Sequence, residues 1–504
     1  MPNKNRSSVA TASALIAGCV CTLMHAEPAR AAQPFLLPNS LIISSTTYHN
    51  TQGAIASLAV GSPIGTTAAA PKATAGNDYV NVWNNSSPDA SFGVTTPIVL
   101  TAVEPHSGHV LRTLQVPTEQ VVTSFSSKSE LGLTITRDRY GPHIVFNGYA
   151  GSGLGALDVS NSDAVAGQDP TNPVTAAFGN TYAFARTIVK VDADGHLSYT
   201  PTRNYGGDNG RAALLGPNGL YYTVGNSNNG SASTFTNPTL PNVTETTGLE
   251  VVNPIDSITS AVAIPSGNSA EVDPLIQYPL GKNGAPDKAG KDNNYRGITE
   301  FRGALYFTKG SGSNGMDTVY TVSPLPTVAD AAAATISVVP GFPTDSARAT
   351  GGDFTPFAVF FANATTMYVT DEGGGDTTDA TTHAGLQKWS LLKGTWQLDY
   401  VLSNGVIGTV DRNLVGYDGQ YPDVTTVGLR GLTGAVDCGK VTLWATTATS
   451  SASGDTGADP NEVVEITDDL RATSLTPAVA KETFKVVAGP TYGTVYRGVA
   501  YVTP

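Results

Sequence analysis

The sequence predicts an all-β fold, a single β-propeller with six blades, and seven blades is the alternative. Two observations predict it. The 504-residue chain holds 54 Gly and 32 Pro, and only 14% of its residues are charged, which suits short strands and turns better than long helices. One sequence unit also recurs along the chain. Repeats of this length that each hold about four short β-rich runs are typical of propeller blades.

The repeated unit is a short segment, with Arg followed by Gly in three of its six copies, that leads into an apolar β-rich run. Tyr295-Arg296-Gly297-Ile298 leads into residues 303–308, and Leu429-Arg430-Gly431-Leu432 leads into residues 440–446. The equivalent positions are Glu130, Arg211, Arg296, Phe357, Arg430 and Arg497. Neighbouring copies lie between 61 residues (Arg296 to Phe357) and 85 residues (Arg211 to Arg296) apart. Six copies therefore predict six blades.

The last copy, residues 496–504, supplies one strand only. Residues 41–48, 98–103 and 109–116 supply three strands near the N-terminus. We expect the C-terminal strand to complete the N-terminal blade, because this pairing closes the ring without an exposed sheet edge.

The first residues have the form of an export signal. Lys4 and Arg6 precede a mostly apolar stretch, residues 9–24, and Ala29-Arg30-Ala31 is a cleavage motif. We expect a signal peptide over residues 1–31 and one propeller domain over residues 32–504, secreted or periplasmic. A lipid anchor on Cys19 is the alternative. The mature chain would keep only Cys438, which we expect to be an inert buried thiol.

Charge and hydropathy argue against nucleic-acid binding and against a membrane-spanning segment. The net charge of −13 argues against a nucleic-acid binder, which needs a basic surface. Beyond the signal, no stretch reaches the roughly 18 apolar residues of a spanning helix, so we expect no transmembrane segment. We expect a monomer.

The repeated arginines are the first candidate site. Arg211, Arg296, Arg430 and Arg497 would begin innermost strands and approach the axis at one mouth of the channel, with Glu130 near them. Long polar loops leave from the same mouth, and such loops commonly carry function. The arginines could hold an anion with their guanidinium forks. Alternatively, each arginine pairs with a carboxylate and with loop carbonyls and so locks neighbouring blades. The expected carboxylates precede these strands: Asp208, Asp292, Asp353 and Asp423.

An acidic, Gly-rich loop is the second candidate site. It carries Asp371, Glu372, Asp376 and Asp379, and flexible carboxylate-bearing loops suit calcium. The alternative is a solvated loop on an acidic protein. No cofactor is required by the sequence, and the HExxH, Walker A and G-x-S-x-G motifs are absent from it.

Four segments resemble a family of secreted, mostly bacterial β-propeller proteins that has no assigned function. They are residues 123–130 with Asn147-Gly148-Tyr149, residues 295–306, residues 385–396, and the closing residues 495–500. The resemblance covers nearly all of the mature chain. It implies export and a propeller, and it implies no catalytic residues.

Two functional classes remain. The first is a binding or scaffold protein that uses its loop-rich face to hold an extracellular glycan, peptide or other partner. The second is an extracellular hydrolase or lyase acting on an anionic polymer or ester, in which calcium could take part. By analogy with propeller sialidases, Glu130, Tyr295 and Tyr496 are the candidate catalytic residues of the second class.

Overall fold

The structure is a computed structural model. It describes residues 34–47, 74–75, 83–84, 95–125, 131–151, 154, 159, 162, 184–206, 208–226, 247–261, 268–272, 293–310, 315–344, 354–374, 383–411, 424–450 and 459–504. Residues 34–504 form one compact unit. The expected signal peptide, with Cys19, lies outside the described residues.

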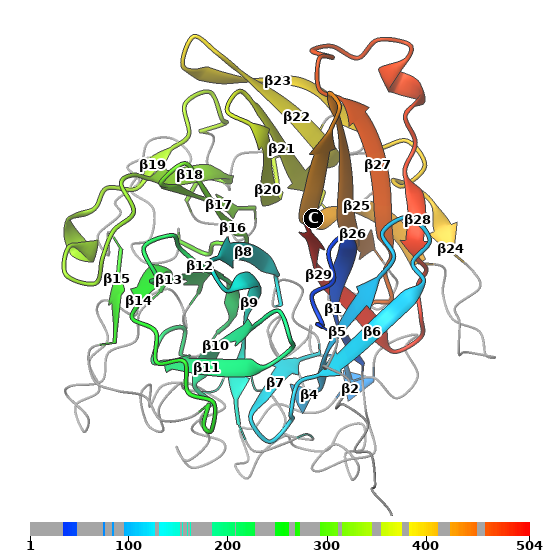
Figure 1. Cartoon of the computed structure of the whole chain (residues 1–504). Helices are drawn as coiled ribbons and strands as arrows, with labels where there is room; N and C mark the ends of the chain where they lie inside the picture. Colours follow the sequence, from blue (N-terminus) through cyan, green and yellow to red (C-terminus); the bar gives the residue numbers. More distant parts are fainter. Residues whose placement is uncertain are drawn as a thin grey trace, which may run out of the picture. The chain divides into compact units, whose positions relative to one another are not determined.

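Six small antiparallel sheets surround a common centre, so the predicted six-bladed propeller is confirmed (Figure 1). Blade 1 consists of β29 (Thr494–Val502), β1 (Ser40–Thr47), β5 (Ile98–Val103) and β6 (Val110–Gln115). Blade 2 consists of β8 (Thr134–Asp138), β9 (Gly141–Ala150), β10 (Arg186–Val191) and β11 (Leu197–Thr202), with β7 (Val121–Ser124) and β4 (Thr95–Thr96) added beside β9. Blade 3 consists of β12 (Gly210–Leu215), β13 (Tyr221–Gly225), β14 (Gly248–Val252) and β15 (Ser269–Glu271).

The remaining blades follow in chain order. Blade 4 consists of β16 (Ile298–Phe301), β17 (Ala304–Lys309), β18 (Thr318–Val322) and β19 (Ser337–Val338). Blade 5 consists of β20 (Pro356–Asn363), β21 (Thr366–Asp371), β22 (Gly385–Leu392) and β23 (Thr395–Leu402). Blade 6 consists of β25 (Val424–Asp437), β26 (Lys440–Ser450), β27 (Val463–Asp469) and β28 (Lys485–Ala488), and β24 (Val410–Asp411) pairs with β25.

Few elements lie outside the blades. A two-stranded pair is formed by β2 (Thr74–Ala75) and β3 (Trp83–Asn84). Within the described part of the chain, two single turns of 3₁₀ helix occur, η6 (Ala331–Ala333) and η8 (Val479–Lys481). Among the described residues, no helix has the length and apolar character needed to cross a membrane.

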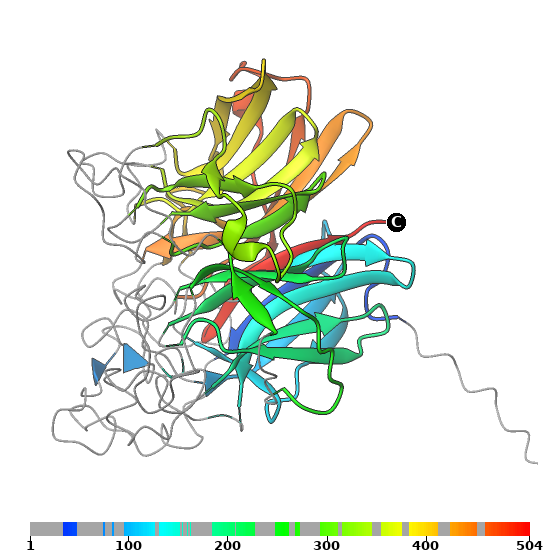
Figure 2. The same cartoon turned by 90° about the vertical axis from the view of Figure 1, so that its left-hand side faces the viewer.

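The ring closes as the sequence predicts. The C-terminal strand β29 pairs antiparallel with β1, with Leu41 opposite Tyr501 and Ile43 opposite Val499. Figure 2 shows β29, in red, running through the middle of the ring. Joining the two ends of the chain in one sheet removes an unpaired inner edge, so ends that are distant in sequence stabilise each other.

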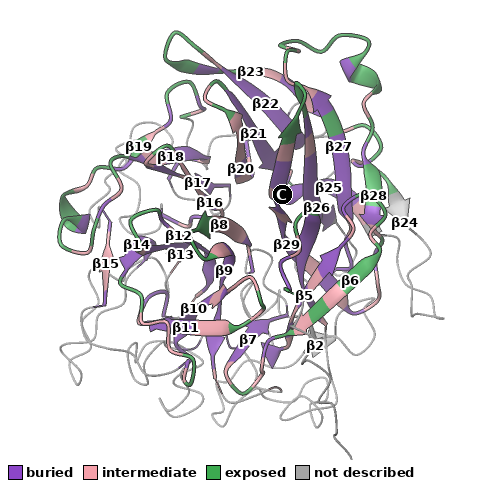
Figure 3. Cartoon of the chain, viewed as in Figure 1, coloured by how far each residue is buried: buried purple, intermediate pink, exposed green. Residues whose placement is uncertain are grey.

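The hydrophobic core lies between neighbouring blades. A cluster of buried side chains lies at each of the six blade junctions; for example, Ile42 of β1 packs in one cluster with Phe146 of β9. Among the described residues, a further cluster joins Val122 of β7 and Tyr149 of β9. Figure 3 shows buried residues through most of the blades and exposed residues on outer strands such as β6. Strands with both faces covered read as continuous apolar runs, which explains the apolar runs of the repeat.

At five of the six junctions among the described residues, a side chain on the second strand of one blade donates a hydrogen bond to a carbonyl at the innermost strand of the next blade. In blade 4, the Thr308 hydroxyl accepts from the Gly297 N–H (3.1 Å) and donates to the Phe357 carbonyl of blade 5 (2.6 Å). The equivalent donors are Ser44, Asn147, Thr370 and Thr446, whose acceptors are the carbonyls of Leu131, Ala212, Arg430 and Arg497. These bonds hold the inner strands together around the axis, and so hold the arginines that follow.

Candidate functional site

The repeated arginines lie where the inner strands bulge. The strand pairing skips Arg211 between Gly210 and Ala212, and it skips Arg430 with the glycine after it. Arg497 lies in a similar break in β29, and Arg296 lies just before β16. Bulges re-aim the side chain of the extra residue. The bulge therefore sets the direction of the side chain at this position of the blade.

The glycine after the arginine has a steric role. A Cβ on Gly297 would fall onto the carbonyl oxygen of Phe357, and a Cβ on Gly498 would fall onto that of Leu131. Because neighbouring inner strands approach this closely, only glycine fits. The Arg-Gly pair thus combines an interior cation with a close strand contact.

Three of the four arginines form one cluster, which we call the axial arginine cluster: Arg211, Arg296 and Arg430. All three are buried, although they come from blades 3, 4 and 6. Burial, together with the nearby Arg211 and Arg430 charges, lowers the pKa of Arg296 to about 9, against the opposing effect of Glu372 and Asp208. The cluster is therefore a place where positive charge is concentrated at low dielectric.

Carboxylates surround the axial arginine cluster. The Nε of Arg430 lies 3.0 Å from an Oε2 of Glu372, which follows strand β21 of the neighbouring blade. Asp208 lies 3.9 Å from an Arg211 Nη2 atom. The Arg430–Glu372 ion pair joins blade 6 to blade 5, as the structural alternative for these arginines predicts. Asp292, Asp353 and Asp423, the other expected partners, lie outside the described residues.

Arg497 belongs to a different environment. Its guanidinium donates to the carbonyls of Ser124 (3.3 Å) and Phe125, which follow from strand β7 beside blade 2. The side chain is buried and joins blade 1 to blade 2. These contacts fit the alternative in which the arginine holds neighbouring blades together and binds no ligand.

An ion pair that the sequence did not indicate lies beside the cluster. Lys309, fully buried at the end of β17, has its Nζ 2.6 Å from Asp317 Oδ1. Burial raises the pKa of Asp317, while Lys309 and Arg296 oppose that rise and Glu372 adds to it. The one sequence signal was a lysine that ends an apolar strand run, Ala304-Leu305-Tyr306-Phe307-Thr308-Lys309.

Arg186 is a second residue that sequence reasoning missed. It donates to the carbonyls of Ser162 (2.8 Å), Phe184 (2.8 Å) and Asp208 (3.1 Å), and its guanidinium lies 5.0 Å from the Tyr149 ring centre. It thereby fixes the segment that leads into Arg211. Because Arg186 begins β10, the third strand of blade 2, the repeat did not single it out.

The acidic loop carries two described carboxylates, and both face protein donors. Asp371 is fully buried and accepts hydrogen bonds from Thr355 (N and Oγ1) and from Gly373 N, and it lies 3.0 Å from His383 Nδ1. Glu372 faces Arg430, as above. Asp376 and Asp379 lie outside the described residues. No group of three or more His, Cys, Asp or Glu side chains that could hold a metal occurs in the described part of the chain.

The structure separates the candidate catalytic residues. Tyr295 is fully buried in an aromatic cluster, with ring-centre distances of 4.6 Å to Phe307 and 5.4 Å to Tyr320. Tyr496 lies in β29 and donates to the Gly489 carbonyl at 3.3 Å. Glu130 lies outside the described residues. No described contact joins the two tyrosines.

Cys438 differs from the expectation. The thiol is exposed, at the tip of the β25–β26 hairpin, where its backbone has a φ of 48°. Hydrogen bonding to Asp437, followed by the charge of that residue, raises the pKa of the thiol. The prediction of burial was wrong because the residue belongs to the turn, but a raised pKa is consistent with low reactivity.

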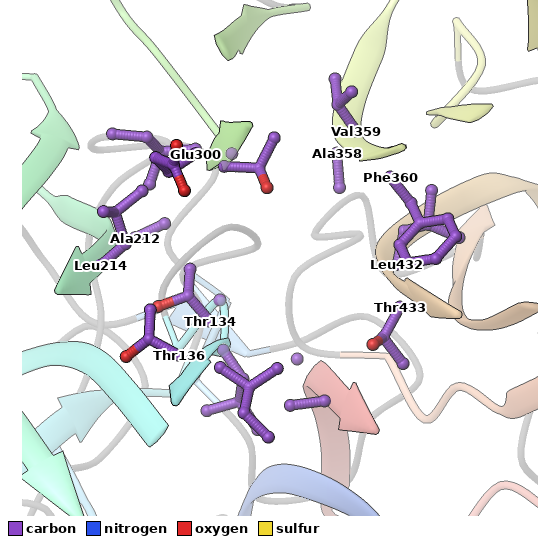
Figure 4. Close-up of a pocket in the computed structure, with 18 of the residues that line it drawn as sticks. Thr134, Thr136, Ala212, Leu214, Glu300, Ala358, Val359, Phe360, Leu432 and Thr433 are labelled. Atoms are coloured by element: carbon purple, nitrogen blue, oxygen red, sulfur yellow. The ribbon is translucent and has the colours of Figure 1, made fainter. Parts of the chain in front are cut away.

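A cavity of about 750 Å³ runs along the axis, lined by all six innermost strands. Figure 4 shows side chains from these strands around it, among them Ala212, Leu214, Val359 and Leu432. Arg296 lines it at the end where the inner strands begin. Arg137, Asp138 and Thr503, all exposed, line it at the end where these strands finish. We call this cavity the axial channel.

Comparison with known proteins finds no family model and no curated protein that matches the chain. Solved structures are matched at low similarity. The GH43_1 enzyme from Xanthomonas citri is 12% identical, with 62% of this chain and 85% of that chain covered and a TM-score of 0.32. A PL25 ulvan lyase is 12% identical, with 90% and 95% covered and a TM-score of 0.28. At these values the function has to be argued from the site, and the family resemblance stays a prediction.

Proposed function

We propose that the protein is a binding protein that holds an anionic extracellular ligand at the axial arginine cluster. The observation that carries this proposal is the meeting of Arg211, Arg296 and Arg430, which come from three blades, at the end of a cavity that Arg296 lines. Guanidinium groups bind carboxylate, sulfate and phosphate strongly through charge-assisted hydrogen bonds.

The energetics of Arg296 support the proposal. Its lowered pKa means that the folded protein holds this cation against a penalty. An anion beside the cluster would offset that penalty. Sites kept for function commonly lower the stability of the fold in this way.

The test compares Arg296→Gln with a matched surface control, Arg471→Gln, whose side chain is 86% exposed. Binding of sulfate, phosphate and galacturonate oligomers is measured by titration calorimetry at low salt. We expect Arg296→Gln to lose binding at least tenfold while its unfolding midpoint stays at or above the wild-type value. Arg471→Gln should bind normally. If the wild type binds no anion, or if Arg296→Gln binds as tightly as the wild type, the proposal fails.

A second candidate function is acid–base catalysis on an anionic polymer, and a specific observation favours it. Asp317 and Glu372 both lie within electrostatic reach of Arg296, but their environments differ. Burial raises the pKa of Asp317, whereas Glu372 faces the Arg430 guanidinium. Two carboxyl groups in unlike environments are the arrangement that separates an acid from a base.

This candidate is tested with purified protein and acidic polysaccharides. New reducing ends report hydrolysis, and ultraviolet absorbance of unsaturated uronates reports elimination. If the chain is such an enzyme, Asp317→Asn should lose at least a hundredfold in rate while still binding the polymer. Binding of the polymer without either product would leave the binding function alone.

We also propose that the chain is exported, on the basis of the signal-like residues 1–31. Expression of the full chain in a bacterium, fractionation and mass spectrometry of the N-terminus test this. A mature N-terminus at Ala32 is expected, and a lipid-modified Cys19 would instead assign the anchored form.

A further inference from the structure

Most of the residues that line the axial channel are apolar, and threonines lie among them. Thr134 uses its hydroxyl to donate to the Ala213 carbonyl (2.6 Å), and the Thr433 hydroxyl accepts from the Tyr501 N–H (3.1 Å). Both hydroxyls thus contact backbone groups, whereas the hydroxyl of Thr136, also in the wall, has no hydrogen-bond partner in the structure. Ala212, Leu214, Ala358, Val359, Phe360 and Leu432 complete this part of the wall (Figure 4).

The two ends of the channel are polar in different ways. Arg296, a member of the axial arginine cluster, lies at the inner end. At the outer end, Glu300 accepts the Gly303 N–H at 2.6 Å, and Arg137 donates to the Thr503 carbonyl at 2.7 Å. Arg296 and Glu300 are four residues apart, which is roughly 13 Å along an extended strand.

From this geometry we infer that the axial channel binds an amphipathic carboxylic acid, with its apolar chain against the strand walls and its carboxylate at Arg296. The inference rests on the proposed anion-binding function, because it uses the same arginine. It adds the chemical class of the ligand, which is a medium-chain acid rather than a sugar acid.

Size and chemistry both support this ligand class. A volume of about 750 Å³ falls in the range of small-molecule sites, which are mostly apolar with a few polar groups that fix orientation. A sugar acid carries hydroxyls along its whole length, and the apolar part of this wall would leave them without hydrogen bonds. A hydrocarbon chain loses nothing there and gains from burial.

The experiment uses the wild-type chain and a homologous series of acids: butyrate, hexanoate, octanoate and decanoate. Affinity is measured by titration calorimetry at pH 7, with sulfate and 1-octanol as additional ligands. We expect affinity to rise about threefold to fourfold with each methylene while the chain remains inside the channel. Octanoate should bind more tightly than 1-octanol, which lacks the charge.

Two variants locate the site. Ala358→Phe, which places a ring in the channel, should weaken decanoate at least tenfold and leave sulfate binding unchanged. Arg296→Gln should remove the preference for octanoate over 1-octanol. Circular dichroism and the unfolding midpoint check that both variants fold. The acid series is measured on the wild-type chain, so its result does not depend on either variant.

The outcomes separate the two proposals. If all four acids and sulfate bind with similar affinity, the channel inference is overturned and anion binding at the arginines stands. If galacturonate oligomers bind and the medium-chain acids do not, the ligand class is likewise overturned. If no anion of any kind binds, the proposed function fails and the channel inference fails with it.

Discussion

The hydroxyl bonds between blades give a sharp stability prediction, and Thr308→Val tests it best. Valine keeps the shape of threonine and removes the hydroxyl, which accepts from Gly297 N–H (3.1 Å) and donates to the Phe357 carbonyl (2.6 Å). Thr308 is fully buried. Each hydrogen bond contributes about 1 kcal/mol, and each buried group left without a partner costs about 1–3 kcal/mol. The expected loss is therefore about 2–4 kcal/mol.

The unfolding entropy sets the size of the thermal shift. At about 2.1 cal/mol/K per residue, a chain of this length has an unfolding entropy near 1 kcal/mol/K, so the midpoint should fall by roughly 2–4 °C. Differential scanning calorimetry at fixed scan rate measures it. Thr308→Ser keeps the hydroxyl and should lose about 1 kcal/mol through its missing methyl group.

A matched control is Thr442→Val. Thr442 carries its hydroxyl 3.2 Å from the Thr467 hydroxyl on the solvent side of blade 6, where a substitution should cost within about 0.5 kcal/mol. If Thr308→Val unfolds at the same temperature as Thr442→Val, the hydroxyl does not hold blades 4 and 5 together, and the reasoning about the other four junctions fails as well.

Three further predictions follow from the same structure. Burial, and then the neighbouring Asp468, raise the pKa of Glu482 to about 8, so its stabilising contribution is complete below about pH 4.5 and is lost as the pH rises toward 8. Because the side chain is partly exposed, the free energy of unfolding should fall by only about 1–2 kcal/mol over this pH range. The variant Glu482→Gln should not show this fall. Urea unfolding measures both proteins, and an equal pH dependence of the two would contradict the prediction. Gly297→Ala should destabilise the fold by more than about 2 kcal/mol, because its Cβ would meet a backbone oxygen. The control Gly489→Ala has open space around its Cβ and should leave the stability unchanged. Similar unfolding midpoints of the two variants would refute the close approach of the strands at Gly297. Calcium at the acidic loop is tested with EDTA: because Asp371 already faces protein donors, we expect no change in unfolding midpoint, and a fall that calcium reverses would assign a metal to the loop.

The positions of the arginines could be predicted from the sequence, but their partners could not. The repeat placed Arg211, Arg296, Arg430 and Arg497 at the start of inner strands, and three of them do meet. Arg497 instead binds two carbonyls of the segment after β7, a strand that the repeat did not include. The partner of Arg430 is Glu372 of the neighbouring blade, and no sequence spacing relates them, because blade contacts join residues that are distant in the chain.

Cys438 shows a local limit of the same kind. The position next to a predicted strand suggested burial, but the residue has a φ of 48° in a hairpin turn and is exposed. A shift of one or two residues at a strand end decides whether a side chain lies in the sheet or in the turn. Such ends are the least certain part of any sequence-based assignment.

The sequence by itself determined the class of this protein: an all-β chain, six repeated units, and closure of the ring by the C-terminal strand. These features follow from local periodicity and from counting copies, which need no knowledge of long-range contacts. Only the tertiary structure decided which charges face one another, that polar side chains of one blade bind carbonyls of the next, and that Arg296 lines one end of a largely apolar axial channel. The physical reason is that each of these depends on contacts between blades, and the direction of a side chain at a bulge is fixed by the neighbouring blade rather than by its own strand.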